Sequence, residues 1–434
     1  MTTTYDPNDP RYLDEADVRG ELTRAFNLCE GCRKCTDLCP SFPTLFALLD
    51  RRDDRDAGWM VPAQQDRVVD GCFQCGACVV ECPHAPGRSE SALDVPRLML
   101  RANAMRWANG HVPLRTKVSV AVAGRTDTVA AVASRAGSVA AAVAGSAPGT
   151  LVRRAVGKVT GVPAQRLLPP VARERFTTWF ARRVTVRLAD ARARVAVYPT
   201  CLVEYQRPDI GRDLVKVLEH NGVECSLAEG AGCCGAPYLH GGDVESFVQS
   251  AVRNVRALAA HVRAGRDVVV AQPTCSLVIR RDYPDFVGGP DADLLAAHTF
   301  DAAEYLMRAH AEGESALDTE FPGDVPESIA YHAPCRLRAQ DVAVRSRDLL
   351  RLTGAPVTVV AVCSGGEEPW SGRARFAGWS ASMAESLGRD LAGAGRVAAG
   401  DCARSNAAVE SQVGVVVRHP IQVIARAYGI PEEP

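Results

Sequence analysis

Two runs of cysteine residues near the start of the chain share one spacing. In each run, two residues separate the first three cysteines, three residues precede the fourth, and a proline follows it. The runs are Cys29, Cys32, Cys35 and Cys39, and then Cys72, Cys75, Cys78 and Cys82. Chains that hold two cubane [4Fe–4S] clusters have this spacing, and the fourth cysteine of each run ligates the other cluster. We therefore expect one cluster on Cys29, Cys32, Cys35 and Cys82, and a second on Cys72, Cys75, Cys78 and Cys39.

Zinc and disulfide bonds are the alternatives for so many thiols. Zinc sites pair two C-x-x-C units, whereas each run here has three cysteines before its C-P pair. Disulfides between such close cysteines would be strained, and nothing marks the chain as secreted. The doubled spacing favours the two-cluster interpretation.

Five further cysteines follow short apolar runs that we expect to be strands. These are Cys201, Cys275, Cys335, Cys363 and Cys402. In open parallel sheets, sites form beyond the carboxyl ends of the strands, so these thiols should gather at one edge. Two more, Cys233 and Cys234, lie between glycines that let backbone N–H groups approach cluster sulfurs. The last, Cys225, lies within a strand and is expected to be an ordinary core residue.

Composition excludes several classes of function. The net charge of −1 over 434 residues gives no general attraction to nucleic acid, which we do not expect as a partner. The first residues have neither a basic nor an apolar signal region, and thiolate ligands favour a reducing compartment. We therefore expect a cytoplasmic protein without a membrane span, because the apolar tract from Ala136 to Val152 is short and broken by glycine and proline.

The residue pattern divides the chain into three segments. Residues 1–113 have helical spacing around both cysteine runs and predict an α-helical ferredoxin domain with two [4Fe–4S] motifs. Residues 114–190 lack cysteine and predict a helical arm that packs against its own domains or touches a membrane surface. Residues 191–434 alternate strands and helices, which predicts parallel sheet. The expected fold class is multidomain, α followed by α/β.

The α/β region is expected to be duplicated, with pseudo-repeats at 191–320 (half one) and 325–434 (half two). Half one has a cysteine after a Tyr-Pro-Thr sequence, then Cys-Cys-Gly, then another cysteine, and half two has a similar order. The intervening lengths are 31 and 27 residues, then 40 and 38. Such a repeat predicts two equivalent halves that face one another.

These motifs resemble the CCG-domain iron–sulfur family that is related to heterodisulfide reductase. The likeness is strongest to the C subunit of anaerobic glycerol-3-phosphate dehydrogenase, and it extends to the iron–sulfur subunits of lactate and glycolate oxidases. The motifs are the paired C-P runs, Gly-Cys-Cys-Gly at 232–235, Pro-Thr-Cys-Ser-Leu-Val before Tyr283-Pro284, Tyr-His-Ala-Pro-Cys at 331–335, and His419-Pro420-Ile421. The resemblance implies electron transfer, with unusual non-cubane clusters or a docking site in the CCG domain.

The chain departs from that family at three ligand positions. Half two has Ser364 in its Cys-Ser-Gly and Ser405 in its Cys-Ala-Arg-Ser, and half one has Val278. Serine oxygen is a poorer iron ligand than thiolate. Half one keeps enough thiols for a third cluster, on Cys201, Cys233, Cys234 and Cys275. Half two keeps only Cys335, Cys363 and Cys402, which are weaker candidates. We expect Arg336, beside Cys335, to face solvent.

Three functions fit these observations. The first is an electron-transfer subunit that relays electrons between a flavoprotein dehydrogenase or a rubrerythrin-like diiron partner and an acceptor, with membrane or quinone contact. No flavin or nicotinamide motif is present, so the chain shows no hydride site and is expected to be a subunit rather than the catalytic one. The second is a catalytic thiol–disulfide or heterodisulfide reductase that uses a CCG-domain cluster. The third is a redox-sensing iron–sulfur protein.

Overall fold

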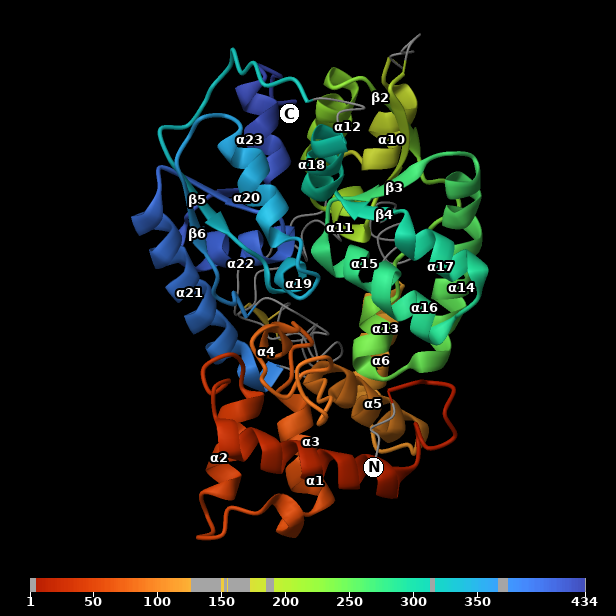
Figure 1. The fold of residues 1–434 in the computed structure, drawn as a ribbon, viewed down its shortest axis with the longest axis vertical. Helices are drawn as coiled ribbons and strands as arrows, with labels where there is room; N and C mark the ends of the chain where they lie inside the picture. Colours follow the sequence, from red (N-terminus) through yellow and green to blue (C-terminus); the bar gives the residue numbers. More distant parts are fainter. Residues whose placement is uncertain are drawn as a thin grey trace.

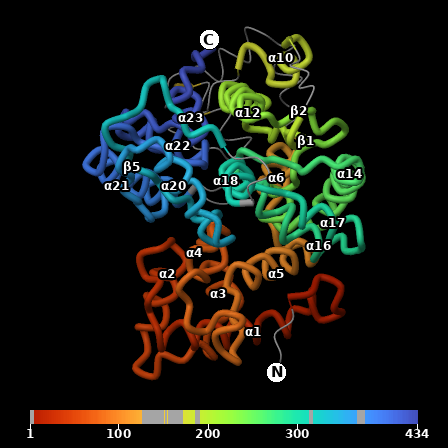
Figure 2. The backbone as a smooth tube through the Cα atoms, turned by 45° about the horizontal axis from the view of Figure 1, so that its top comes forward, coloured from red at the N-terminus to blue at the C-terminus, as the bar shows by residue number. Residues whose placement is uncertain are grey.

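The computed structural model describes residues 5–125, 150–151, 154, 172–184, 191–312, 317–365 and 374–433. A helical N-terminal region forms one end of the molecule, and two α/β halves lie side by side on it (Figures 1 and 2). In Figure 1 the helical region is red to orange, half one is green and half two is blue. The short helix α4 (Ala77–Val80) lies beneath half two, where it meets α19 (Cys335–Arg338).

The helical region begins with α1 (Glu15–Cys32), whose start follows from local chemistry. The Asp14 carboxylate accepts a hydrogen bond from the Asp17 N–H, and the acidic first turn complements the helix dipole. The sequence predicts a helical stretch from Leu13 to Phe26, but the helix continues through Cys29 to Cys32 and closes at Arg33 with a φ of 50°. The remaining elements are α2 (Ser41–Leu49), η1 (Ala57–Trp59), α3 (Pro62–Asp70), α4 and α5 (Val95–Ala108).

A core of apolar side chains from α1, α2 and α5 holds this region together. Leu22, Leu45 and Leu98 are each almost fully buried in it. At its edge, Arg101 of α5 is fully buried. Its guanidinium donates to the carbonyls of Arg11 and Tyr12, at 2.5 and 2.9 Å, and to the Asp17 carboxylate at 2.6 Å. These bonds offset much of the cost of burying the cation, although Nη1 has no hydrogen-bond partner among the described residues, and they fix the N-terminal segment on α5.

The α/β halves contain two four-stranded sheets in which every pairing is parallel. The strand orders, β2-β1-β3-β4 and β6-β5-β7-β8, have the same form. The strands are β1 (Ala193–Tyr198), β2 (Val223–Leu227), β3 (Asp267–Val270), β4 (Thr299–Asp301), β5 (Ile329–His332), β6 (Val357–Val360), β7 (Val397–Gly400) and β8 (Val417–Arg418). Within each sheet, parallel pairing directs all carboxyl ends, and the loops that follow them, to one edge.

Helices pack on both sheets, and apolar residues of strands and helices form continuous cores. The helices of half one are α11 (Cys201–Tyr205), α12 (Pro208–His220), α13 (Ala236–Gly241), α14 (Val244–Arg263), α15 (Pro273–Leu277), the π-helical η2 (Val278–Asp282), α16 (Tyr283–Phe286), α17 (Pro290–Ala297) and α18 (Ala302–Glu312). The helices of half two are α19, α20 (Ala343–Arg351), η3 (Ala374–Phe376), α21 (Ala377–Ala394), α22 (Ala403–Val413) and α23 (Pro420–Ala427).

The expected arm at 114–190 is described only in part. Its first helix, α6 (Leu114–Gly124), packs on α13, where Gly241 faces the side chain of Val120 and Gly124 faces the Tyr238 ring. A second helix, α10 (Phe176–Arg182), packs on α12. The tract from Ala136 to Val152 lies almost wholly outside the described residues. Of the helices within the described ranges, none has the length and apolar character needed to cross a membrane.

Candidate functional site

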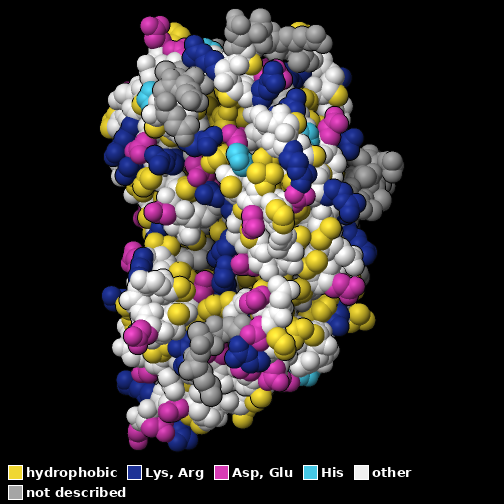
Figure 3. All heavy atoms as spheres, turned by 45° about the vertical axis from the view of Figure 1, so that its right-hand side comes forward, with side chains coloured by type: hydrophobic (Ala, Val, Ile, Leu, Met, Phe, Trp, Pro, Cys, Tyr) yellow, Lys and Arg dark blue, Asp and Glu magenta, His cyan; other side chains and the backbone are white. Residues whose placement is uncertain are grey.

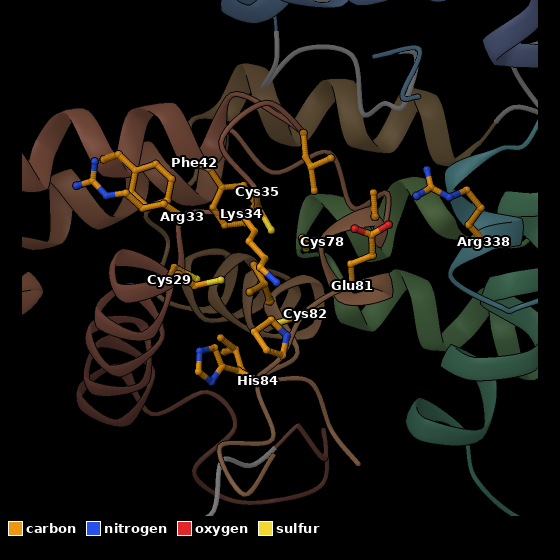
Figure 4. A pocket seen from close by; sticks show the side chains of 17 residues that line it. Cys29, Arg33, Lys34, Cys35, Phe42, Cys78, Glu81, Cys82, His84 and Arg338 are labelled. Atoms are coloured by element: carbon orange, nitrogen blue, oxygen red, sulfur yellow. The ribbon is translucent and has the colours of Figure 1, made fainter. Parts of the chain in front are cut away.

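Five cysteines of the helical region line a cavity of about 100 Å³, and one of them, Cys78, also lines the second cavity described below. Cys29 and Cys32 lie on the last turns of α1, Cys35 follows the reversal at Arg33, and Cys82 follows α4. Figure 4 shows the sulfur atoms of Cys29, Cys35 and Cys82 facing a common space. We call Cys29, Cys32, Cys35 and Cys82 the first thiol group. Its fourth member comes from the other cysteine run, as the exchange of fourth ligands requires.

Four cysteines line a smaller cavity of about 10 Å³ deeper in the domain. They are Cys39, Cys72, Cys75 and Cys78, which we call the second thiol group. Cys39 precedes α2, and the N–H groups of Ser41 and Phe42 donate to its sulfur at the start of that helix. Cys72 follows α3, and the other two lie just before and on α4. Each run therefore gives its fourth thiol to the other group.

The two groups differ in depth. All members of the second thiol group are buried, whereas those of the first are partly exposed. Burial and, to a smaller extent, the neighbouring thiols raise the pKa of Cys29 to about 12 and that of Cys35 to about 11. Thiolates crowded in this way need a cationic partner, and binding one releases the protons.

The donor set is the one that four-iron clusters use. Each group offers four thiols, and the His84 side chain also lines the cavity of the first group. Within the described part of the chain, no three His, Cys, Asp or Glu side chains are arranged to hold a single metal ion. A cubane is much larger than one ion, and its ligands surround a cage rather than a point. The thiols of each group therefore fit such a cluster.

Half one brings together the four cysteines that its sequence suggested. The sulfur atoms of Cys201, Cys233, Cys234 and Cys275 interact with one another. They come from the segments that follow β1, β2 and β3. We call these four the half-one group. Cys225 is not among them, because it lies within β2 with its thiol directed to the carbonyls of Val215 and Val223.

Two polar residues of half one hold the turn that carries Cys233 and Cys234. The fully buried Asn254 of α14 accepts from the Gly232 N–H at 2.9 Å and donates to the Cys233 carbonyl at 3.0 Å. It also donates to the Tyr283 hydroxyl, which in turn donates to the Cys234 carbonyl, at 2.9 and 3.0 Å. No sequence signal marked Asn254, because a polar residue in an amphipathic helix looks like a surface residue.

Half two does not assemble its three cysteines into a comparable group. Cys335 and Cys402 line a cavity of about 10 Å³ together with Ser364 and Ser405, the two serines at positions where the family resemblance implies cysteine. Cys402 receives a hydrogen bond from the Gln272 amide of half one at 3.5 Å. Cys363 is not among the residues that line this cavity, and its sulfur accepts from the Gly365 N–H at 3.4 Å.

Cys363 and Cys335 instead contact a cysteine of the helical region. The side chains of both hydrogen-bond with Cys75 of the second thiol group. We call Cys75, Cys335 and Cys363 the thiol triad. The hydrogen bonds from these two thiols lower the pKa of Cys75 well below its ordinary value. The triad joins residues more than 250 positions apart, and no local pattern could have predicted it.

Our expectation that Arg336 faces solvent is wrong. Arg336 is only 1% exposed, because α19 turns it into the interface between α4 and half two. Its positive charge also lowers the pKa of Cys75. His332 is buried beside it, with Nε2 against the Val362 carbonyl at 3.0 Å, and burial lowers its pKa to about 4. A buried cation beside Cys75 favours its thiolate.

The two halves meet where these segments end. The Gln340 amide, just after α19, donates to the Ser276 hydroxyl of α15 at 3.2 Å, and α15 also carries Cys275. With the bond between Gln272 and Cys402, this brings the cysteine-bearing segments of half one and half two against each other.

Charged side chains surround the cavity of the first thiol group. The Lys34 side chain lies beside the cysteine sulfurs (Figure 4). Glu81 and Arg338 lie on the opposite side of the cavity and point toward one another. On the face in Figure 3, cationic and anionic side chains are interspersed over the whole surface. No single sign dominates that face, in keeping with the net charge of −1.

Comparison with known families identifies two domains. A 4Fe–4S dicluster domain matches residues 22–83, and a CCG cysteine-rich domain matches residues 195–280. These matches confirm the resemblance and the iron–sulfur cofactors expected from the sequence. They also confirm the coarse fold, a helical ferredoxin domain with a parallel-sheet CCG domain.

The chain is homologous to subunits of known oxidoreductases. It is 24% identical to the C subunit of the anaerobic glycerol-3-phosphate dehydrogenase of Escherichia coli strain K12, over 83% of this chain and 99% of that protein. It is 28% identical to the B subunit of the fumarate reductase (CoM/CoB) of Methanothermobacter marburgensis, over 36% of this chain and 29% of that protein. Lactate utilization protein A of Bacillus pumilus is 25% identical, over 38% of this chain and 64% of that protein.

Proposed function

We propose that this chain is the iron–sulfur electron-transfer subunit of an oxidoreductase complex. The observation that carries the proposal is the convergence of eight cysteines into two thiol groups, one partly exposed and one buried against the α/β halves. The first thiol group would hold one [4Fe–4S] cluster and the second another. Each such cluster, when bound, takes up and releases one electron without a proton.

The positions of the first and second thiol groups define a path for the transferred electrons. The first thiol group opens toward solvent, where Lys34 is exposed and an external partner could dock. The second thiol group reaches half two through Cys75. Half two contacts α15 of half one through Gln340. Electrons would therefore pass from the surface, through the helical region, into the crevice between the halves.

We further propose a third cluster on the half-one group, held by Cys201, Cys233, Cys234 and Cys275. Their mutual contacts and the bonds of Asn254 to the turn support this assignment. The matching strand orders of the two sheets support an internal duplication, with pseudo-repeats at 191–320 and 325–434. In this scheme residues 1–113 are the ferredoxin domain and residues 114–190 connect it to the CCG domain.

The redox partner would be another subunit of the same oxidoreductase. The names of the homologues, subunits of a glycerol-3-phosphate dehydrogenase and of a fumarate reductase, support a dehydrogenase or reductase partner. We propose a flavoprotein dehydrogenase first and a rubrerythrin-like diiron protein second. Cytoplasmic location with peripheral contact to a membrane quinone pool belongs to the same proposal.

Iron analysis and EPR of anaerobically purified protein test the cluster assignment. About eight irons per chain would correspond to the first and second thiol groups, and about twelve would add the half-one group. Zinc in place of iron would contradict the proposal. Turnover of small disulfides by the purified chain, with a reductant but no partner, would favour the disulfide reductase instead.

A further inference from the structure

We propose that Cys335 and Cys363 form a redox-active pair, a dithiol that converts to a disulfide and back, beside the second thiol group. The inference rests on the proposed electron-transfer function, because it needs a cluster at Cys75 as electron donor. It gives half two a role that does not require a cluster of its own.

The remaining thiols of half two are divided between two neighbours. Ser364 and Ser405 have replaced two ligand positions around the cavity that Cys335 and Cys402 line. Cys402 accepts a hydrogen bond from Gln272 of half one, while Cys363 contacts Cys75 and Cys335. Three thiols that serve different contacts, with two serines between them, are a poor set for a four-iron cluster. Two thiols in mutual contact are a suitable set for a disulfide.

Cys335 and Cys363 are placed for that chemistry. Both are free thiols, their side chains hydrogen-bond with each other, and both residues are partly exposed. Cys335 begins α19, and Cys363 lies in the loop after β6, followed by Ser364 and Gly365. A loop residue can move the short distance from thiol contact to a bonded pair more easily than one within a strand.

The electron donor is fixed beside the pair by tight packing. Gly76 follows Cys75 with a φ of +77°, and a Cβ built on it would lie 2.8 Å from the Cβ of Ala339. The backbone of the second thiol group therefore touches the end of α19 with no space for a side chain. The buried guanidinium of Arg336 lies within electrostatic reach of Cys75. Negative charge that arrives at this point is stabilised by that cation.

The reaction balances as a two-electron, two-proton couple. The bond between the sulfurs of Cys335 and Cys363 breaks, and each sulfur takes one electron and one proton to become a thiol. The electrons come one at a time from the external donor of the proposed relay, by way of the ligand Cys75. The protons come from water, which reaches these partly exposed residues. The pair would thus store two electrons at the entrance to the α/β halves.

Mass spectrometry of the intact, cluster-loaded chain tests the pair directly. The protein is poised anaerobically with dithionite or with a mild oxidant, quenched in acid with N-ethylmaleimide, and digested with trypsin. Cys335 and Cys363 are the only cysteines of peptides 309–336 and 352–373. We expect these two peptides to be joined after oxidation and separately alkylated after reduction. Iron content and EPR are recorded on the same samples.

Electron counting gives a second measurement. In a coulometric titration, the Cys335→Ser and Cys363→Ser variants should each take up two electrons fewer per chain than the wild type. Cys225→Ser is the matched control, because Cys225 is a buried core thiol that donates hydrogen bonds to backbone carbonyls of α12 and β2 and lies outside the thiol groups. That variant should keep both the joined peptides and the full electron count.

Three results would overturn the pair. The first is separate peptides 309–336 and 352–373 in oxidised protein that retains about eight irons. The second is a link from either peptide to Cys75, located by fragmenting the joined peptide 68–88, which also contains Cys72, Cys78 and Cys82; such a link would show that Cys75 is not a cluster ligand. The third is protection of both thiols by bound iron. The first and third leave the proposed electron transfer intact, whereas protein without iron contradicts that function itself.

Discussion

Replacing Gly76 with alanine should weaken the junction between the ferredoxin domain and half two. Two costs are expected. A left-handed alanine costs about 1–2 kcal/mol, and Gly76 has a φ of +77°. Forcing a Cβ to 2.8 Å from the Cβ of Ala339 adds a packing cost of about 1–3 kcal/mol.

Gly87 separates these two costs. It has the same φ of +77°, but no atom lies within 4 Å of where its Cβ would be. Gly87→Ala therefore carries only the backbone cost, together with the same gain from a stiffer unfolded chain. Gly76→Ala should be less stable than Gly87→Ala by about 1–3 kcal/mol, which is the packing cost alone.

The assay is anaerobic thermal unfolding followed by cluster absorbance and far-UV circular dichroism, with one scan rate for all variants. At about 4 °C per kcal/mol for a domain near 100 residues, Gly76→Ala should melt about 4–12 °C below Gly87→Ala. Combining Gly76→Ala with Ala339→Gly removes the close contact and should recover most of this difference. Equal melting temperatures for the two single variants would refute the contact between α4 and α19.

Three further outcomes are expected. Cys82→Ser should lower the iron content by about four per chain, although Cys82 lies in the second cysteine run, because its thiol completes the first group. Burial lowers the pKa of His419 to about 3, so its contribution to stability is present above pH 6.5 and is lost as pH falls below it. Between pH 7.5 and 5.5 the wild type should lose about 1.4 kcal/mol more than His419→Asn, which keeps the helix cap. Tyr283→Phe removes the hydroxyl that Asn254 binds, should cost about 1–2 kcal/mol by thermal unfolding, and should selectively reduce any third EPR signal.

Controls make these three tests specific. Cys225→Ser should retain all the iron, and loss of four irons from it would show that iron content reports general damage. Tyr428→Phe removes a hydroxyl that donates to the Asp318 carbonyl, far from the half-one group along the chain, and should leave the EPR spectrum unchanged. Parallel pH profiles for wild type and His419→Asn would show that His419 is not buried in its neutral form.

The ferredoxin domain was the more predictable part of the chain. Its cluster motifs are local, and the spacing alone predicts that Cys39 and Cys82 are exchanged between the clusters; the Cys82 thiol lies near Cys29 and the Cys39 thiol near Cys72. The helix that carries Cys29 was expected to end too early, because cysteine is a weak helix former and no signal marked its continuation. The strands before the CCG cysteines were visible as apolar runs, whereas β4, which precedes no cysteine, has three residues, too few for a pattern.

Long-range contacts could not be predicted. The sequence showed that half two had lost ligands at Ser364 and Ser405, but not that Cys363 meets Cys75. Arg336 was assigned to the surface because arginine is seldom fully buried, and only the packing of α19 on α4 reverses that expectation. Such contacts depend on how two domains dock, and a single sequence carries no periodicity that records docking.

The exchange of fourth cysteines also has a consequence for biogenesis. Because Cys39 and Cys82 each complete the group begun by the other run, neither half of the ferredoxin domain is a self-sufficient chelator. If the two groups bind clusters as proposed, inserting iron at one group would draw the two runs together and preorganise the other group, so that maturation would be cooperative. A chain cut anywhere between Cys39 and Cys72 would forfeit both metal centres rather than one.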